Sequence, residues 1–218
     1  EEEGALDLAI ELAVEKNADL VLANDPDADR LAVVVHHKDN WCRLNGNEIG
    51  VLLAEHILSK GQGEDRLVVT TVVSSRLLSK IADFHKVKYA ETLTGFKWIV
   101  RPGLEDKNSR FVFGYEEALG FALGDSVRDK DGITSALAFA ELAAELKAED
   151  KTVMDLLDEL WNRHGVHKTA LFTKRLDAET DISADFMSPW RTSPPERIGE
   201  FVVIESIDLL TPESGLPA

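Results

Sequence analysis

Apolar residues along this chain fall into short runs with two different spacings. Runs rich in β-branched and aromatic residues predict strands at residues 19–23, 31–35, 66–73, 87–93 and 110–116. Apolar residues repeated every three or four positions predict helices at residues 5–14, 45–60, 74–85, 131–148 and 152–165. Residues 95–106 have a helix-like pattern that Pro102 interrupts, and residues 36–41 predict a turn.

The order of these elements predicts the fold class. Strands and helices alternate from residue 45 onward, which favours an α/β fold with a mixed, mainly parallel sheet covered by helices. Ligands of such sheets bind at the carboxyl ends of the strands. The stretches TLTGFK at 92–97 and GYEEALG at 114–120 fall at those ends.

The two ends of the chain differ from its middle in their pattern of polar and apolar residues. Asp7, Glu11 and Glu15 form one polar stripe on the first helix, so we expect that helix to be mostly buried. Beyond residue 166 we expect a strand at 167–175, a proline-rich connector at 188–196 and another strand at 200–210, which together make a partial α+β segment.

Composition excludes several kinds of partner. The 218 residues include 24 Lys and Arg against 40 Asp and Glu, a net charge of −16. This balance argues against nucleic acid or an anionic membrane as a partner, since both require a basic surface. The sequence shows no membrane span or signal peptide pattern. A single cysteine, Cys42, cannot form an internal disulfide, so we expect a reducing, cytoplasmic location.

The stretch DPDADR at residues 25–30 carries the strongest chemical signal. Asp25, Asp27 and Asp29 crowd three like charges into one loop between two strands, which favours a bound divalent cation such as Mg²⁺. An EF-hand loop is excluded, because Arg30 and His36 stand where it needs glycine and glutamate. The alternative is a solvated polar turn closed by Arg30. Arg30 itself is either a structural salt-bridge partner or faces an anion, for which phosphate is our first hypothesis.

Three further stretches hold candidate ligand-binding residues. Residues 92–101 contain Lys97 and Arg101 but no acidic residue. Gly95 would allow backbone N–H groups to approach an anion there. The alternative, that Lys97 is simply a solvated surface lysine, fits the sequence equally well. Arg128 and Lys130 lie next to the predicted start of a helix at Asp131. Helix capping accounts for Asp131 without any further function, but it does not account for the two cations.

In GYEEALG, Glu116 and Glu117 are adjacent carboxylates at a strand end. Such a pair suits vicinal sugar hydroxyls, and the alternative is a turn with exposed charge.

Together these stretches resemble the α-D-phosphohexomutases, the phosphoglucomutase and phosphomannomutase superfamily. The matching motifs are DPDADR (25–30), TGFKWI (94–99), GYEEALG (114–120) and RDKDG (128–132), in the family's order. The resemblance implies a reversible phosphoryl transfer between hexose 1-phosphate and hexose 6-phosphate, through a phosphoserine on the enzyme and a bisphosphate intermediate.

The resemblance also implies a role for each candidate residue. The three aspartates would bind Mg²⁺, Arg30 would steady the phosphate, and Lys130 would be an electrostatic or acid/base helper. Glu116 would bind sugar hydroxyls. The remaining substrate-binding residues would be Thr94, Gly95, Lys97 and Arg128.

Some positions depart from the family's pattern. Ala118 replaces the serine of the usual Glu-x-Ser sugar loop, a variant that is similar to a branch with pentose-phosphate-preferring mutases, so glucose, mannose and pentose phosphates all stay open. The nucleophile signature Thr-Ala-Ser-His-Asn-Pro is absent, and Ser74 and Ser75 are interpreted as helix caps. The terminal phosphate loop is absent too, and RTSPPE at 191–196 is interpreted as a connector.

The resemblance further implies a division of the chain. Residues 1–44 would end the metal-loop domain, residues 45–165 would be the sugar-binding domain, and residues 166–218 would be a linker and the start of a C-terminal domain. The sequence has no initiator methionine and starts inside a helical pattern, so we expect this chain to be a piece of a longer polypeptide. The rest of that polypeptide would be its partner, and this chain alone would not catalyse the reaction. A non-catalytic sugar-phosphate or cation-binding module is the alternative. An aspartyl-phosphate phosphatase is disfavoured by Asp29 and Arg30, which depart from that family's pattern after D-x-D.

Overall fold

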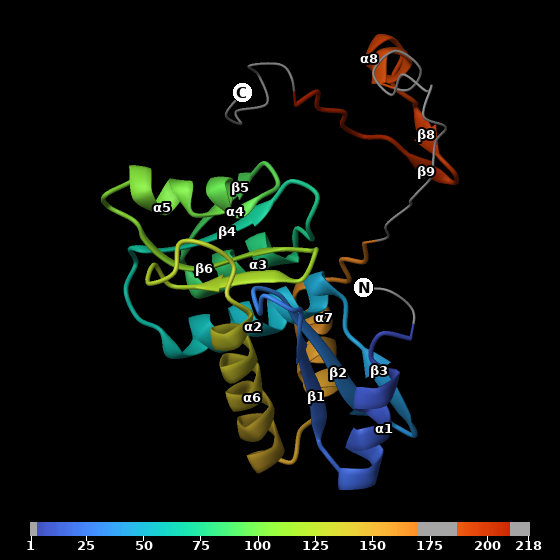
Figure 1. Cartoon of the computed structure of the whole chain (residues 1–218). Coiled ribbons are helices and arrows are strands. Elements are labelled where there is room, and N and C mark those ends of the chain that lie inside the picture. The colour runs from blue at the N-terminus through green and yellow to red at the C-terminus, as the bar shows by residue number, and fades with distance from the viewer. Residues whose placement is uncertain (1–3, 170–186, 210–218) are drawn as a thin grey trace. The chain divides into compact units, whose positions relative to one another are not determined.

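Two separate sheets organise the first of the chain's two units, Glu1–Thr169 (Figure 1). The structure, a computed structural model, describes residues 4–169 and 187–209. One sheet is antiparallel and carries the aspartate loop, and the other is mixed and carries the remaining candidate motifs. The second unit, Ala170–Ala218, is described separately below.

The antiparallel sheet has the order β1-β2-β3, with β1 at Leu20–Asn24, β2 at Leu31–His37 and β3 at Asn40–Arg43. The turn predicted over residues 36–41 is present but shorter than predicted. His36 pairs with Trp41 across a hairpin, their rings 5.6 Å apart edge to face, so only Lys38 and Asp39 lie outside the two strands. This cross-strand contact is long-range information that the local polar pattern did not contain.

The mixed sheet has the order β5-β4-β6-β7. Its strands are β4 (Arg66–Thr71), β5 (Lys88–Thr92), β6 (Arg110–Glu116) and β7 (Gly120–Leu123). The pairs β4–β5 and β4–β6 are parallel and β6–β7 is antiparallel, which confirms the predicted α/β fold with a mixed, mainly parallel sheet. Strand β7 was not predicted, because its four residues begin with Gly120 and are followed by Gly124, a pattern typical of a loop.

Helices cover both faces of the mixed sheet (Figure 1). The larger core lies against α2 (Gly46–Lys60), α3 (Leu77–His85), α6 (Gly132–Ala148) and α7 (Val153–His164). It contains the largest fully buried side chains, Phe113, Tyr115, Phe121 and Phe139. A smaller core on the opposite face includes residues of α4 (Phe96–Ile99), and α5 (Arg101–Glu105) follows α4 after a break at Val100.

Side-chain caps fix where three of these helices begin. Asn45 and Glu48 form a capping box at α2, Thr152 and Asp155 form another at α7, and Asp131 accepts two backbone N–H bonds at α6. Helix α3 starts at Leu77, later than predicted, and Ser74 does not cap it. Ser75 Oγ accepts a 3.3 Å hydrogen bond from the Leu77 N–H.

Helix α1 (Asp7–Lys16) contradicts the expectation that it is mostly buried. Leu8 is 81% exposed and Leu12 is 53% exposed, and Ala13 is the only residue of the helix that is buried. The helix covers a small cluster on the antiparallel sheet around Val21 and Val34. One face of α1 therefore packs against the sheet, and its other apolar side chains are exposed to solvent.

The second unit contains short elements in residues 187–209. Helix α8 (Ser188–Thr192) lies where a connector was predicted, and β8 (Arg197–Ile198) pairs with β9 (Phe201–Val202). The strand predicted at 200–210 is therefore limited to two residues within the described range. Residues 167–169 have no regular structure, and 170–175 of that predicted strand lie outside the described residues. Within 4–169 and 187–209, no helix combines the length and apolarity needed to cross a membrane.

Candidate functional site

The aspartate loop joins β1 to β2 and brings its three carboxylates together. One oxygen of each of Asp25, Asp27 and Asp29 lies within 4.8 Å of the others, which confirms the predicted convergence. The loop turns tightly because the Ala28 N–H donates to the Asp25 carbonyl at 2.9 Å, with Ala28 at a φ of 58°. Three carboxylates of this kind form an oxygen donor set that fits a hard divalent cation such as Mg²⁺.

Arg30 closes this loop against Asp25. Its backbone N–H donates to Asp25 Oδ1 at 3.1 Å, and its Nε lies 3.9 Å from Asp25 Oδ2. Partial burial raises the pKa of Asp25, but the Arg30 hydrogen bond and positive charge outweigh burial and leave that pKa below its usual value. Asp25 is therefore held ionised, which is the form that a metal ligand needs.

Lys130 reaches the same loop from the segment before α6. Its Nζ lies 2.6 Å from Asp29 Oδ2, and this contact is the first reason that the pKa of Lys130 is raised. The side chain is 21% exposed, and the contact with Asp29 directs its ammonium at the loop. Two motifs that are about 100 residues apart in the sequence thus meet here.

Glu116 stands at the end of β6 and faces this cluster of charges. The residue is 8% exposed, and burial raises the pKa of its carboxyl. A hydrogen bond from the Gly95 N–H opposes that rise, as do the charges of Lys130 and Arg30. Glu116, Gly95, Lys130 and Arg30 therefore act on one another electrostatically, and the sugar-loop motif adjoins the metal-loop motif.

The other predicted substrate-binding residues lie at the edge of this cluster or apart from it. Gly95 has a φ of 109°, which glycine adopts readily, and Thr94 and Lys97 on either side are exposed. The Lys97 ammonium lies 5.4 Å from the Trp98 ring centroid. Arg128 lines a separate cavity of about 160 Å³ with Val100, Gly103 and Arg110.

The adjacent carboxylates of the sugar loop point to different partners. Glu117 Oε2 accepts hydrogen bonds from Ser74 Oγ at 2.7 Å and Thr71 Oγ1 at 3.2 Å. Glu117 is therefore already hydrogen-bonded within the protein, whereas binding of sugar hydroxyls by the acid pair stays a prediction. Glu116 is the last residue of β6, whereas Glu117 lies in the turn that follows, and the two side chains have different partners.

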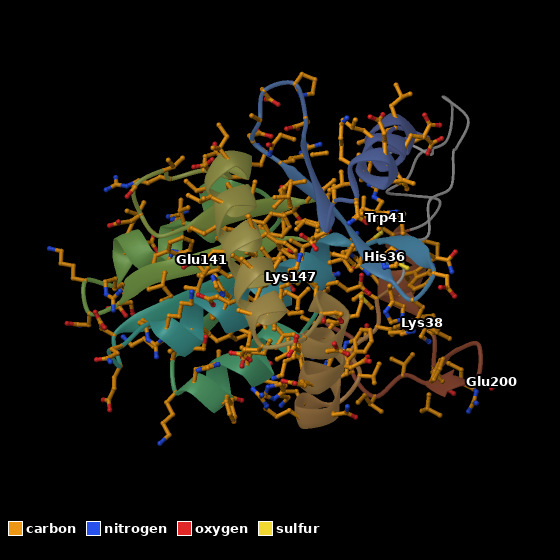
Figure 2. All side chains as sticks on the ribbon, turned by 90° about the horizontal axis from the view of Figure 1, so that it is seen from below. His36, Lys38, Trp41, Glu141, Lys147 and Glu200 are labelled. Carbon is orange, nitrogen blue, oxygen red and sulfur yellow. The ribbon has the colours of Figure 1, made fainter. Side chains whose placement is uncertain are left out.

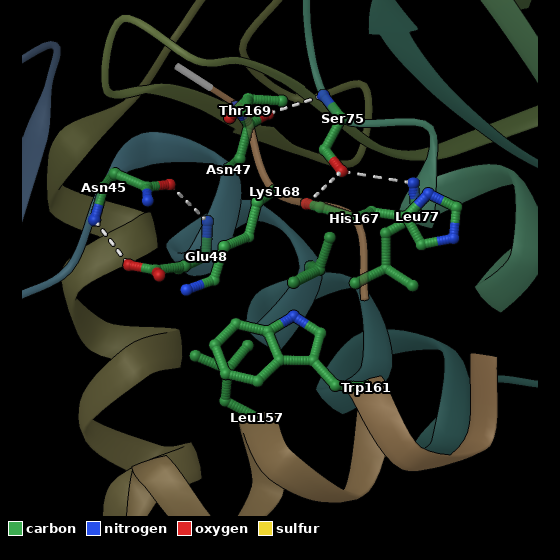
Figure 3. Close-up of a pocket in the computed structure, with 11 residues that line it drawn as sticks. Asn45, Asn47, Glu48, Ser75, Leu77, Leu157, Trp161, His167, Lys168 and Thr169 are labelled. Carbon is green, nitrogen blue, oxygen red and sulfur yellow. Dashed lines mark hydrogen bonds between the residues drawn. The ribbon is translucent and has the colours of Figure 1, made fainter. Parts of the chain in front are cut away.

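Asn47, which the sequence pattern did not single out, bonds to Tyr115 in the GYEEALG stretch and lines a nearby pocket (Figure 3). Asn47 Oδ1 accepts from the Ser75 N–H at 2.7 Å and from the Tyr115 hydroxyl at 3.1 Å, and Asn47 Nδ2 donates to Thr169 Oγ1 at 2.9 Å. Asn47, Ser75 and Thr169 line a pocket of about 180 Å³. The only sequence signal was the Asn-Gly-Asn start of α2, which indicates a helix entry.

A second groove, of about 480 Å³, lies at the other end of the hairpin. His36, Trp41 and Lys147 contribute to its walls (Figure 2). It adjoins the Leu20–Val35 pair, whereas the aspartate loop follows the Asn24–Leu31 pair. None of the predicted site residues lines it, so it does not extend the candidate site.

Comparisons with known proteins identify two parts of the chain. Residues 45–164 match the family model described as "Phosphoglucomutase/phosphomannomutase, alpha/beta/alpha domain III". Residues 1–38 match the corresponding model of domain II.

Curated relatives carry matching names. A "Probable phosphomannomutase" of Haemophilus influenzae is 41% identical over 210 residues, which cover 95% of this chain and 42% of the relative. A phosphoglucomutase of Staphylococcus aureus strain RF122 is 36% identical, over 98% of this chain and 40% of its own length. The chain thus spans about two fifths of the length of these relatives.

A solved structure agrees with this assignment. The phosphoglucomutase pp63/parafusin of Paramecium, in an open form, superposes with a TM-score of 0.57 at 25% identity, over 74% of this chain and 28% of its own. The two family models together match most of the chain, and its motifs converge on one site. This chain therefore belongs to the phosphoglucomutase/phosphomannomutase family.

Proposed function

We propose that the chain is part of a phosphosugar mutase that interconverts hexose 1-phosphate and hexose 6-phosphate through a phosphoserine enzyme and a bisphosphate intermediate. One observation carries the proposal: the aspartate loop and Lys130 are in contact, and Glu116 lies within the field of Lys130 and Arg30. A reaction that moves a phosphoryl group on a sugar needs a cation site, a phosphate partner and a hydroxyl acceptor close together.

The metal loop would serve the phosphoryl group. Asp25, Asp27 and Asp29 would hold Mg²⁺, which when bound neutralises charge on the transferring group. Arg30 would bind a phosphate oxygen beside it. Lys130, whose contact with Asp29 raises its pKa, would act as a positive charge or an acid/base helper beside the substrate.

The sugar loop would bind the hexose. Glu116, ionised, would accept hydrogen bonds from sugar hydroxyls, and Thr94, Gly95, Lys97 and Arg128 would bind the rest of the sugar phosphate. With Ala118 in place of the usual serine, glucose, mannose or pentose phosphate would be the substrate. The rest of the same polypeptide would supply the phosphoserine and the terminal phosphate loop, in a cytoplasmic enzyme.

The proposed function also implies a division of the chain into domains. Residues 1–44 would complete a metal-loop domain, 45–165 would form the sugar-binding domain, and 166–218 would link to a C-terminal domain. Support comes from the family matches at 1–38 and 45–164. The metal loop and the sugar loop would then belong to two domains, with the substrate between them.

The proposal is tested at the central aspartate. Asp27→Asn should weaken Mg²⁺ binding by more than roughly tenfold in isothermal titration calorimetry, because affinity follows the number of charged ligands. Asp39→Asn, in the β2–β3 turn of the same sheet, is the matched control and should bind as the wild type does. Equal Mg²⁺ affinity in Asp27→Asn and the wild type would remove the metal assignment.

The same variant tests the reaction. In the full-length protein, Asp27→Asn should lower turnover of glucose 1-phosphate by several orders of magnitude, while this chain alone should show no turnover even with a bisphosphate primer. Turnover by the isolated chain would contradict its dependence on a phosphoserine elsewhere. A full-length protein that binds Mg²⁺ but turns over no sugar phosphate would instead indicate a binding module.

A further inference from the structure

The first turn of α6 lies directly against the metal loop. The Gly132 N–H donates to the Ala28 carbonyl at 3.1 Å. The N–H of the preceding residue, Asp131, donates to the Phe121 carbonyl at 2.8 Å. The loop is thus bonded to the start of a 17-residue helix that packs on the mixed sheet. A loop held in this way takes its position from the sheet.

Gly132 permits this contact only because it lacks a side chain. A Cβ atom at this position would lie 2.3 Å from the Arg30 carbonyl oxygen, 2.4 Å from Asn24 Nδ2 and 2.8 Å from the Ala28 carbonyl oxygen. Two of these three neighbours are backbone atoms of the metal loop itself. Any side chain here must therefore push the loop away from α6.

Asn24 also holds the loop, through a side-chain hydrogen bond next to Gly132. Its Nδ2 donates to the Arg30 carbonyl at 2.7 Å, across the neck at which β1 and β2 part. Arg30 also bridges to Gly120, and the Leu31 N–H donates to the Leu119 carbonyl at 3.1 Å. Both ends of the loop are fixed, and the three carboxylates project from a backbone with little freedom to adjust.

We propose that Asn24 and Gly132 are positioning residues that hold the metal loop in a geometry selective for Mg²⁺ over Ca²⁺. The inference rests on the proposed metal site. Mg²⁺ requires near-octahedral oxygen ligands at about 2.0–2.1 Å, whereas Ca²⁺ accepts six to eight ligands at about 2.3–2.6 Å in variable geometry. A rigid loop favours the smaller ion, and a loosened loop loses that preference.

The test compares the two ions in this chain by calorimetric titration. Asn24→Ala should weaken Mg²⁺ binding roughly tenfold, at the lower end of what loss of outer-shell support costs, and change Ca²⁺ binding by less than about twofold. Asn162→Ala, at an exposed asparagine on α7, is the matched control and should change neither. A merely structural role would lower both affinities by the same factor, and an unchanged Mg²⁺ to Ca²⁺ ratio would overturn the proposal.

Gly132→Ala provides an independent check from α6. It should shift the ion ratio in the same direction, while Thr134→Ala, at an exposed position in the first turn of the same helix, should not. If Gly132→Ala fails to fold, the Asn24→Ala ratio still decides the question. A wild type that binds no Mg²⁺ would refute the metal site and this inference together, whereas wild-type binding with an unaltered Asn24→Ala ratio would refute the inference alone.

Discussion

At the scale of single residues, Glu116 is the side chain whose surroundings oppose its charge. Burial and the neighbouring Glu117 carboxylate raise its pKa, and the Gly95 N–H, Lys130 and Arg30 only partly compensate. A carboxyl with a raised folded pKa binds its proton more tightly in the native state, so its contribution to stability falls as pH rises above the ordinary value of 4.5. The proposed sugar contact is thus maintained at a cost in stability.

We expect Glu116→Gln to stabilise the protein above the ordinary glutamate pKa while it weakens sugar-phosphate binding, because glutamine keeps the shape without the buried charge. Thermal melts should show a difference from the wild type that is small at about pH 4 and grows toward about pH 7.5. Glu64→Gln, at an exposed loop position, should show no such trend. A Glu116→Gln protein that melts below the wild type at the higher pH would contradict the assignment.

The sequence alone predicted much of the site's residue chemistry. The crowding of Asp25, Asp27 and Asp29 required a cation or a close approach, and their carboxylates do converge. The partner of Glu117 could not be predicted, because Ser74 and Thr71 precede it by more than 40 residues and meet it only through the pairing of β4 with β6. Asn24 and Gly132 were likewise invisible, since their importance lies in contacts with backbone carbonyls.

At the scale of elements, Glu117 links the end of β4 to the sugar loop after β6. Ser74 and Thr71 donate to the same oxygen and also contact each other at 2.8 Å, and both hydroxyl groups belong to buried residues. Gly46, at the start of α2, supports the loop further: a Cβ there would lie 2.0 Å from the Glu117 carbonyl oxygen. The loop that carries Glu116 is consequently fixed by two neighbouring elements.

Removal of a hydroxyl group that donates to Glu117 should lower the stability of the protein. Ser74→Ala leaves the Glu117 carboxylate with one donor fewer in a half-buried place, and we expect a loss of about 1–3 kcal/mol in the free energy of unfolding. Urea denaturation measures the change, and Ser126→Ala in an exposed loop provides the baseline. A loss no larger than that baseline would show that Glu117 is solvated and that the β4 contact contributes nothing.

Elements with strong periodicity were predictable, and those that depend on distant partners were not. Helices α2, α6 and α7 begin where Asn45, Asp131 and Thr152 cap them, and these capping residues are visible in the sequence. Strands β3 and β7 have four residues each, too few for a pattern, and exist because β2 and β6 pair with them. The exposure of α1 was missed because an apolar helix face predicts burial without saying what covers it.

At the scale of the whole molecule, the two units differ in how they bury apolar side chains. Unit Glu1–Thr169 has two cores on its mixed sheet and a smaller one under α1. In residues 187–209 of the second unit, the large apolar side chains are mostly exposed, and these include Trp190, Ile198, Phe201, Val202 and Ile204. Exposed apolar side chains in this number favour association.

We therefore expect a chain that ends at Thr169 to bind less of the dye ANS than the full chain does. Its Mg²⁺ affinity and its melting temperature should stay the same, because the loop and the cores belong to the first unit. Fluorescence titration and calorimetry measure these quantities on the same samples. Equal dye binding would mean that the second unit covers its apolar side chains, and a lower melting temperature would mean that the first unit depends on it.

The different partners of Glu116 and Glu117 have a consequence for enzyme engineering. A library intended to change sugar preference would naturally randomise the whole acidic loop, yet the Glu117 carboxylate is already bonded to Ser74 and Thr71. Position 116, the proposed sugar ligand, and position 118, where alanine replaces the usual serine, are the ones to vary, and position 117 should be kept as glutamate, because its bonds help to hold the loop. A library built in this way wastes fewer clones on proteins that do not fold.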